Sequence, residues 1–210
     1  MKKQRKDKRI VIGVTGVFGS GKSTVSRFLK AFGLKIIDAD KIAHSYLLPK
    51  AKAYKKIVNF FGKGILGPKR YINRKKLGDL VFSNPRMLKR LNSIVHPNIV
   101  RDIKIKLKKF KRGAVVLDAP LLLEAGLRNI VDSLIVVIID RDEHIRRMVK
   151  KRRLKKTEVV KRIKTQIPIR RKAHVADFII DNSGSFTNTK KQVKSILEKI
   201  QGGSSGKTGD

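Results

Sequence analysis

A glycine-rich stretch near the start of the chain has the residue types and spacing of a phosphate-binding loop. Residues 16–23 read GVFGSGKS, a full match to the G-x-x-x-x-G-K-[ST] pattern. Glycines let the backbone turn its N–H groups toward phosphate oxygens, and the N-terminus of a following helix adds partial positive charge. Lys22 can then reach the β- and γ-phosphates of a nucleotide, and the Ser23 hydroxyl can bind Mg²⁺. The pattern predicts binding of a nucleoside triphosphate.

Acidic residues follow two other apolar stretches. Asp38 and Asp40 come after Ile36 and Ile37, and Asp118 ends the run 115–118. Aspartate at position 38 or 40 could accept a proton from a substrate hydroxyl, hold the metal or cap the following helix. Asp118 has the usual position of the carboxylate that holds Mg²⁺ through water in such NTPases, with a helix cap as the alternative.

These residues need a parallel sheet to bring them to one edge. Short β-branched runs alternate with longer amphipathic stretches, as buried parallel strands joined by crossover helices do. We therefore expect an α/β, three-layer P-loop NTPase fold with a five-stranded parallel sheet and a helix over 22–32. The expected strands are 10–15, 34–38, 114–118, 133–139 and 177–181.

The interval 40–112 has no clear buried strand and is too long for one crossover. We expect a mostly helical insertion there. Ile103, Ile105 and Leu107 alternate with lysines, as an exposed strand would, but the spacing of Ile103 and Leu107 also suits one face of a helix. We favour the helix, with Pro97 in its first turn.

The chain of 210 residues carries 52 Lys+Arg against 16 Asp+Glu, a net charge of +36. Positive charges at this density repel one another, and bound polyanions such as phosphorylated ligands or nucleic acid would screen them. The simpler explanation of the charge is a lysine-rich, solvated surface. The lack of cysteine excludes disulfides, thiolate zinc sites and cysteine nucleophiles. No apolar run is long enough to span a bilayer. We expect a cytoplasmic protein, not associated with membranes, with a disordered basic arm at 1–9 and a flexible tail at 201–210.

An ordered set of short motifs resembles the dephospho-coenzyme A kinase family, over about residues 10–200. Beside the phosphate loop with Thr24 after it, the motifs are Ile37–Asp40, Arg74 and Leu77 ahead of Val81-Phe82, His96-Pro97, Asp118–Leu122 with Glu124, Gln166 and Ala176–Asn182. The resemblance implies an ATP-dependent kinase that phosphorylates the ribose 3′-hydroxyl of dephospho-coenzyme A, the last step of coenzyme A biosynthesis, with ATP and Mg²⁺ bound.

The family's nucleoside-monophosphate-kinase-like arrangement implies three parts for this chain. The nucleotide-binding core would comprise 10–39, 113–145 and 168–200. The helical insertion 40–112 would bind the acceptor, and 146–167 would form a helical lid. We expect a monomer or a weak oligomer.

The resemblance also implies roles for single residues. Asp40 would orient or deprotonate the acceptor hydroxyl, and Lys22 and Arg147 would neutralise the transferring phosphate. Asn182 would lie near the adenine, and Ser23 and Asp118 would hold the metal. The nucleotide-binding set is Gly19, Ser20, Gly21, Lys22, Ser23, Thr24 and Asn182.

Two assignments stay open. His96 precedes Pro97 at an expected helix start, so it is interpreted as a structural cap, with an active role as the alternative. Where many family members have a lid arginine, this chain has Lys151, followed by Arg152 and Arg153. Lysine lacks the bidentate fork of arginine. Either Arg152 makes that contact instead, or the lid binds phosphate without the paired hydrogen bonds that an arginine would make.

Two other functions compete with this interpretation. One is a kinase of the same fold that acts on a nucleoside or a nucleoside monophosphate. The other is an RNA-binding P-loop NTPase. The basic run Arg146–Lys156 contains no aromatic residue to stack on bases. Any nucleic-acid binding is therefore expected to be electrostatic and nonspecific.

Overall fold

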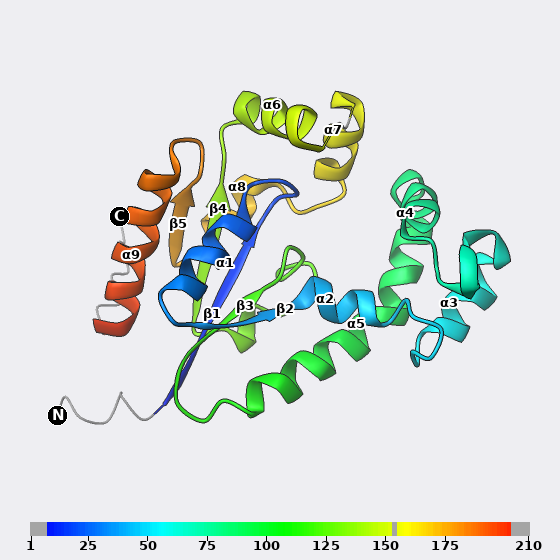
Figure 1. Ribbon diagram of the computed structural model, residues 1–210, viewed down its shortest axis with the longest axis horizontal. Helices are drawn as coiled ribbons and strands as arrows, with labels where there is room; N and C mark the ends of the chain where they lie inside the picture. Colours follow the sequence, from blue (N-terminus) through cyan, green and yellow to red (C-terminus); the bar gives the residue numbers. More distant parts are fainter. Residues whose placement is uncertain (1–7, 153–154, 203–210) are drawn as a thin grey trace. The chain divides into compact units, whose positions relative to one another are not determined.

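The computed structural model describes residues 8–152 and 155–202 (Figure 1). The chain forms two compact units. The first unit contains the residues up to Ile37 and those from Phe110 onward, and the second is Asp38–Lys109. The second unit corresponds to the helical insertion predicted at 40–112. It begins two residues earlier and ends three residues earlier than predicted.

The sheet has five strands in the order β2-β3-β1-β4-β5. The pairs β1–β3, β1–β4 and β4–β5 are all parallel. The predicted five-stranded parallel sheet is therefore confirmed, and β1 is central in it. Strands β1, β3 and β4 contain buried β-branched residues and leucine, which is typical of strands inside a parallel sheet that is covered on both faces. The bounds are β1 (Arg9–Gly16), β2 (Lys35–Asp38), β3 (Gly113–Asp118), β4 (Ser133–Ile138) and β5 (Phe178–Asp181).

Helices of the first unit form layers on the sheet. Val25 of α1 and Val193 of α9 pack in one cluster with Ile12 of β1, so α1 and α9 share a face. A side chain at Gly13, the next residue of β1, would lie on the opposite face of the sheet, where its Cβ would be 2.9 Å from Leu122 Cδ1. The helices are α1 (Lys22–Ala31), α6 (Arg141–Arg152), α7 (Lys156–Lys164), α8 (Ile169–His174) and α9 (Phe186–Gly202), with a 3₁₀ turn at Arg128–Ile130.

The second unit is helical, as predicted. Its α5 includes the stretch for which a strand was the alternative: Ile103 and Leu107 are buried, whereas Ile105 is 50% exposed. That burial follows the helical period and not alternation. None of the helices in the described ranges is both long and apolar enough to cross a membrane. The unit contains α2 (Ala39–Ser45), α3 (Tyr54–Phe61), α4 (Arg74–Ser83), α5 (Pro85–Lys108) and 3₁₀ turns at Lys63–Ile65 and Pro68–Arg70.

The predicted position of Pro97 in a first turn is wrong. Helix α5 begins at Pro85, where the Asn84 side chain accepts hydrogen bonds from two backbone N–H groups of the first turn. Pro97 lies inside the helix, so His96 does not cap a helix start either. The side-chain amide of Asn98 donates to the Ile94 carbonyl oxygen at 3.2 Å, which supplies a donor close to the proline. An Asn-Pro pair at 84–85 is itself a helix-start signal, and it comes first in the chain.

Both ends of the folded chain extend slightly beyond their predicted limits. Arg9, assigned to the basic arm, is the first residue of β1 and pairs with Gly113. Gln201 and Gly202, assigned to the tail, end α9. The predicted arm up to residue 7 and the tail from residue 203 lie outside the described residues.

A buried ion pair ties α8 to the segment that follows β3. The Lys172 side chain is fully buried, and its Nζ lies 2.8 Å from Glu124 Oε1. Lys172 also donates to the Pro120 carbonyl oxygen at 3.0 Å, and the Thr15 hydroxyl donates to the same oxygen at 3.1 Å. The backbone N–H of Ile167 donates to Glu124 Oε1 at 3.0 Å. One buried charge pair thus connects the end of β1, the segment after β3 and the start of α8.

Lys172→Met should strongly destabilise the fold, because it leaves the Glu124 carboxylate buried without its cation. Removing one partner of a buried pair costs roughly 3–5 kcal/mol in the free energy of unfolding. Urea denaturation followed by circular dichroism measures the loss. The double variant Glu124→Gln, Lys172→Met should be more stable than the single variant, since no unpaired charge remains. An equal or larger loss in the double variant would mean that packing, not charge pairing, accounts for the effect.

Candidate active site

The phosphate loop connects β1 to α1, and two of its glycines are required by the geometry. Gly19 and Gly21 have φ angles of 81° and 94°, in the region that favours glycine. A Cβ on Gly21 would lie 1.9 Å from Asn182 Nδ2, and one on Gly19 would lie 2.4 Å from Met148 Sδ. Ser20, between them, is buried, and its Oγ has no hydrogen-bond partner among the residues that the structure describes. The loop thus leaves an unsatisfied polar group next to a backbone that tolerates no added side chain, as a phosphate cradle would.

The N-terminus of α1 completes this cradle. Gly21 is the N-cap, and no side chain caps the first turn. Lys22 is 9% exposed, and its Nζ lies 3.5 Å from the Val17 carbonyl oxygen, so its ammonium group lies close to the loop. Ser23 is exposed and Thr24 is partly buried in the same turn. A helix start of this kind attracts anions through its N–H groups and its dipole.

Ser23 and Asp118 are two residues near the loop that could bind a magnesium ion through oxygen atoms. The Ser26 hydroxyl of α1 donates to Asp118 Oδ2, at the end of β3, at 2.6 Å. Ser23 is three residues before Ser26 and therefore lies on the same side of α1, toward Asp118. Among the described residues, no group of three or more acidic or histidine side chains could hold a metal by itself. A hydroxyl and a carboxylate fit Mg²⁺, which takes its other ligands from water and nucleotide phosphates.

The backbone of Phe18, at the tip of the loop, is held from two sides. Its N–H donates to Gln166 Oε1 at 2.7 Å, and its carbonyl oxygen lies 2.6 Å from His144 Nε2. Because a carbonyl only accepts, Nε2 of His144 must carry the hydrogen. Burial lowers the pKa of His144, the Lys22 charge lowers it further, and the bond to Phe18 opposes the shift. His144 thus acts as a neutral donor that shapes the loop without adding charge.

Asn182 braces the loop from the end of β5. Its Nδ2 donates to the Ser20 carbonyl oxygen at 2.9 Å, and its Oδ1 accepts from the Thr189 hydroxyl at 3.1 Å. The side chain is 7% exposed. These partners give Asn182 a positioning role on the phosphate loop, and its contact with adenine stays a prediction.

Arg147 of α6 is held by the same region. Its guanidinium donates to the carbonyl oxygens of Asn182 and Ser183, at 2.7 and 2.8 Å, and pairs with Glu143. Contact with a transferring phosphate would require Arg147 to leave these partners, so that role stays a prediction. The side chains of Lys151 and Arg152, and the whole of Arg153, lie outside the described residues.

The second unit carries the remaining predicted residue, Asp40. Asp38 caps α2, since its side chain accepts from the Lys41 N–H at 2.9 Å, so the capping alternative holds for Asp38. Asp40 follows in the first turn and is exposed, and His44 lies one turn further along α2. Burial and the Arg74 charge lower the pKa of His44, whereas Asp40 and Asp38 raise it. His44, near the end of α2, is thus influenced both by the carboxylates at the start of the helix and by Arg74, the first residue of α4.

Sequence reasoning did not assign a role to several residues that position the loop. His144 was not singled out, and the only signal for it was its place shortly after the strand at 133–138. Gln166 and Glu124 belonged to the family resemblance without a role. Lys172 gave no signal, because lysines are common throughout this chain and its burial is a tertiary property.

The fold should lose stability as pH falls through the His144 titration. Because folding lowers the pKa of His144, the unfolded chain takes up a proton near its ordinary value of about 6.5 before the folded protein does. Stability present above that value is therefore lost as the pH falls below it. His144→Gln retains an N–H donor and should show a shallower fall in Tm between about pH 7.5 and 5.5. His174→Gln, at an exposed position, is the control, and equal slopes for wild type and His144→Gln would refute the assignment.

Comparison with known proteins identifies the family. Residues 10–188 match the family model of dephospho-CoA kinase. The chain is 43% identical over 192 residues to a dephospho-CoA kinase of Carboxydothermus hydrogenoformans, covering 90% of this chain and 93% of the relative. It is 39% identical to that of Oceanobacillus iheyensis over 193 residues, with 90% and 97% coverage.

Solved structures agree with this assignment. A dephospho-CoA kinase from Campylobacter jejuni is 30% identical, with a TM-score of 0.65, over 93% of this chain and 98% of that one. A shikimate kinase from Bacteroides thetaiotaomicron, 14% identical with a TM-score of 0.52 over 91% and 98% of the two chains, shares the fold alone. Family model, relatives and fold lead to one conclusion: the chain belongs to the dephospho-CoA kinase family.

Proposed function

We propose that this kinase, which phosphorylates dephospho-coenzyme A with ATP, binds ATP on the phosphate loop of its first unit and activates the ribose 3′-hydroxyl of the acceptor with Asp40 of its second unit. The observation that carries the nucleotide assignment is the loop itself. Gly19 and Gly21 leave no space for side chains. Within the described ranges, the buried Ser20 hydroxyl has no partner and no side chain caps α1. Each of these features suits the oxygens of a bound phosphate.

Stabilising charge is the main chemical task in phosphoryl transfer. The transition state is loose, with negative charge spread over the transferring oxygens. The Lys22 ammonium group and the N–H groups of the loop would stabilise that charge. Mg²⁺, held by Ser23 and Asp118 when bound, supplies further positive charge at the β- and γ-phosphates. Arg147 would contribute in the same way if it leaves its carbonyl partners.

Asp40 supplies the base in this proposal. Its exposed carboxylate accepts the proton of the 3′-hydroxyl while the hydroxyl oxygen bonds to the γ-phosphorus. The bond from that phosphorus to the β–γ bridging oxygen breaks, and ADP leaves. His44, on which the charges of both Asp40 and Arg74 act, would help to position the acceptor.

Other properties of the chain stay predictions from its composition and its family. The helical insertion 40–112 would hold the acceptor, and residues 146–167 would form the lid. A cytoplasmic location, a monomeric or weakly oligomeric state and a nonspecific, salt-sensitive attraction to nucleic acid follow from the sequence arguments. Family membership favours dephospho-coenzyme A over the nucleoside and RNA-dependent alternatives.

Lys22→Ala should lower kcat by roughly 10²–10³-fold, as loss of one transition-state donor does in other enzymes. An assay of ADP release with dephospho-coenzyme A and ATP measures this change. Lys30→Ala removes an exposed lysine in the last turn of the same helix and should leave kcat unchanged. Near-normal turnover in a folded Lys22→Ala protein, checked by circular dichroism, would remove Lys22 from the catalytic account.

Asp40→Asn should lower kcat by roughly 10²–10⁴-fold, because a general base is lost. ATP binding, measured by calorimetry, should change little. Asp38→Asn is the matched control, since asparagine retains the cap of α2 and kcat should stay near that of the wild type. Equal losses in the two variants would contradict the division of roles. Loss of ATP–Mg²⁺ affinity in Asp40→Asn would assign that residue to the metal instead.

A further inference from the structure

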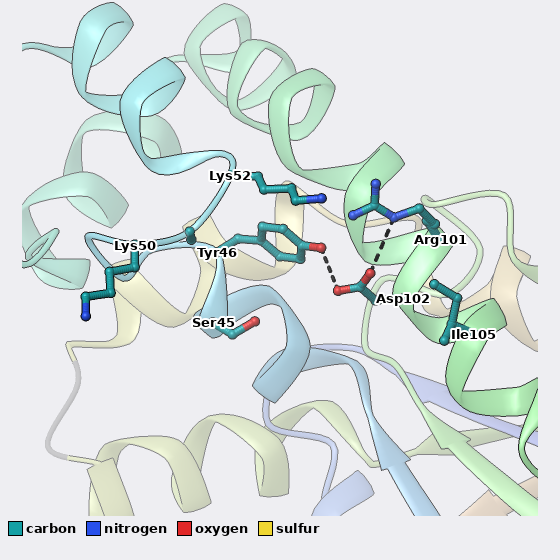
Figure 2. A pocket seen from close by; sticks show the side chains of 8 residues that line it. Ser45, Tyr46, Lys50, Lys52, Arg101, Asp102 and Ile105 are labelled. Carbon is teal, nitrogen blue, oxygen red and sulfur yellow. Dashed lines mark hydrogen bonds and ion pairs between the residues drawn. The ribbon is translucent and has the colours of Figure 1, made fainter.

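A pocket of about 580 Å³ lies within the second unit, a volume typical of ligand sites (Figure 2). It is bounded by the end of α2, the segment that leads to α3, and α5. The residues on which the argument depends are Ser45, Tyr46, Lys52, Arg101, Asp102 and Ile105. All of them belong to the same compact unit as Asp40.

A partly buried hydrogen bond lies at the edge of the pocket. Tyr46 is 5% exposed, and its hydroxyl donates to Asp102 Oδ2 at 2.6 Å. Asp102 Oδ1 lies 3.5 Å from Arg101 Nε. Burial raises the pKa of Tyr46, and the bond to Asp102 raises it further, so the hydroxyl keeps its proton and remains a donor. The only acidic side chain lining this pocket is therefore already engaged by Tyr46 and Arg101.

The remaining charge of the pocket is positive. Lys52 and Arg101 extend toward the same space beside the Tyr46–Asp102 pair, whereas Lys50 extends away on the other side of Tyr46 (Figure 2). Over the part of the chain that the structure covers, the Lys52 ammonium group makes no hydrogen bond or ion pair. Two cations that approach one another repel, and an anion between them removes that repulsion. Arginine and lysine together suit the oxygens of a phosphate group.

Helix α2 connects this pocket to Asp40. Asp40 is in the first turn of α2, and Ser45 is its last residue. A rise of about 1.5 Å per residue separates them by roughly 8 Å along the helix axis. Dephospho-coenzyme A carries its reacting 3′-hydroxyl and its 5′-linked diphosphate on one ribose. An acceptor with its hydroxyl at Asp40 can therefore direct its diphosphate toward the far end of the same helix.

We propose that Lys52 and Arg101 bind the diphosphate of dephospho-coenzyme A in this pocket. The inference rests on the proposed function, because it takes the acceptor and the position of its hydroxyl from there. The Tyr46–Asp102 pair holds α2 against α5 and so positions the two cations. Ile105, which is 50% exposed, offers apolar surface to the uncharged arm that follows the diphosphate.

Steady-state kinetics of Lys52→Ala, Arg101→Ala and the double variant test this site. In the double variant, the KM for dephospho-coenzyme A should rise roughly 10- to 100-fold, as expected for the loss of charge-assisted hydrogen bonds. The KM for ATP and kcat should stay close to the wild-type values. Arg101→Lys should fall between Arg101→Ala and wild type. Lys104→Ala and Lys106→Ala, at exposed positions of α5 outside the pocket lining, are the controls and should leave every constant unchanged.

A truncated acceptor distinguishes diphosphate binding from a general effect on the second unit. Adenosine has the ribose 3′-hydroxyl but no diphosphate, so its kcat/KM should be the same in wild type and double variant. An equal fall in kcat/KM for adenosine and dephospho-coenzyme A would overturn the proposal, as would an unchanged KM for dephospho-coenzyme A. A rise in the KM for ATP alone would assign the pocket to the other substrate and would also overturn it.

Calorimetry with dephospho-coenzyme A separates this inference from the proposed function. If the wild type binds dephospho-coenzyme A but fails to phosphorylate it, the proposed function fails, and weaker binding by the double variant would still support the site. If phosphorylation is normal and the double variant binds as tightly as the wild type, only the site fails. Thermal melts of each variant confirm that the protein is folded.

Discussion

The phosphate loop imposes the strictest physical constraint in this protein. Its backbone must keep N–H groups directed at a ligand and hold a lysine ammonium group close by, in a turn that only glycine allows at Gly19 and Gly21. Such a loop has few contacts of its own to hold it open. Other parts of the first unit therefore hold it: His144 and Gln166 at Phe18, and Asn182 at Ser20. Residues from α6, from the segment after α7 and from the end of β5 thus keep one turn in place.

The contribution of a charged side chain in this protein depends on where it lies and what it contacts. The chain carries a net charge of +36, and two of the described cations show how position matters. Lys172 is buried against Glu124, and Arg147 is bound by carbonyl oxygens. His144, next to Lys22, is kept neutral, so it donates a hydrogen bond without adding repulsion. Most of the basic excess lies on exposed surface and needs no catalytic explanation.

The two units differ in secondary structure, and the proposed function assigns them different tasks. The sheet of the first unit provides a rigid edge for a nucleotide, where strands end and backbone N–H groups converge. In the proposals made above, the helical second unit provides Asp40 on α2, Lys52 in the segment that follows α2, and Arg101 on α5.

The sequence by itself determined the features that depend on local pattern. The five strands, the phosphate loop, the helix after it and the helical character of 103–107 follow from hydrophobic periodicity and glycine spacing, which neighbouring residues settle among themselves. Only the tertiary structure decided that His144 and Lys172 are buried and that Asn182 holds the phosphate loop. The contacts that carry these outcomes join distant positions: Asn182 and Ser20 are 162 residues apart, and His144 and Phe18 are 126 apart. Hydrophobic periodicity indicates which face of a helix or strand is buried. The hydrogen-bond partner of a buried polar group depends instead on how distant elements pack together, and a local sequence pattern does not contain that information.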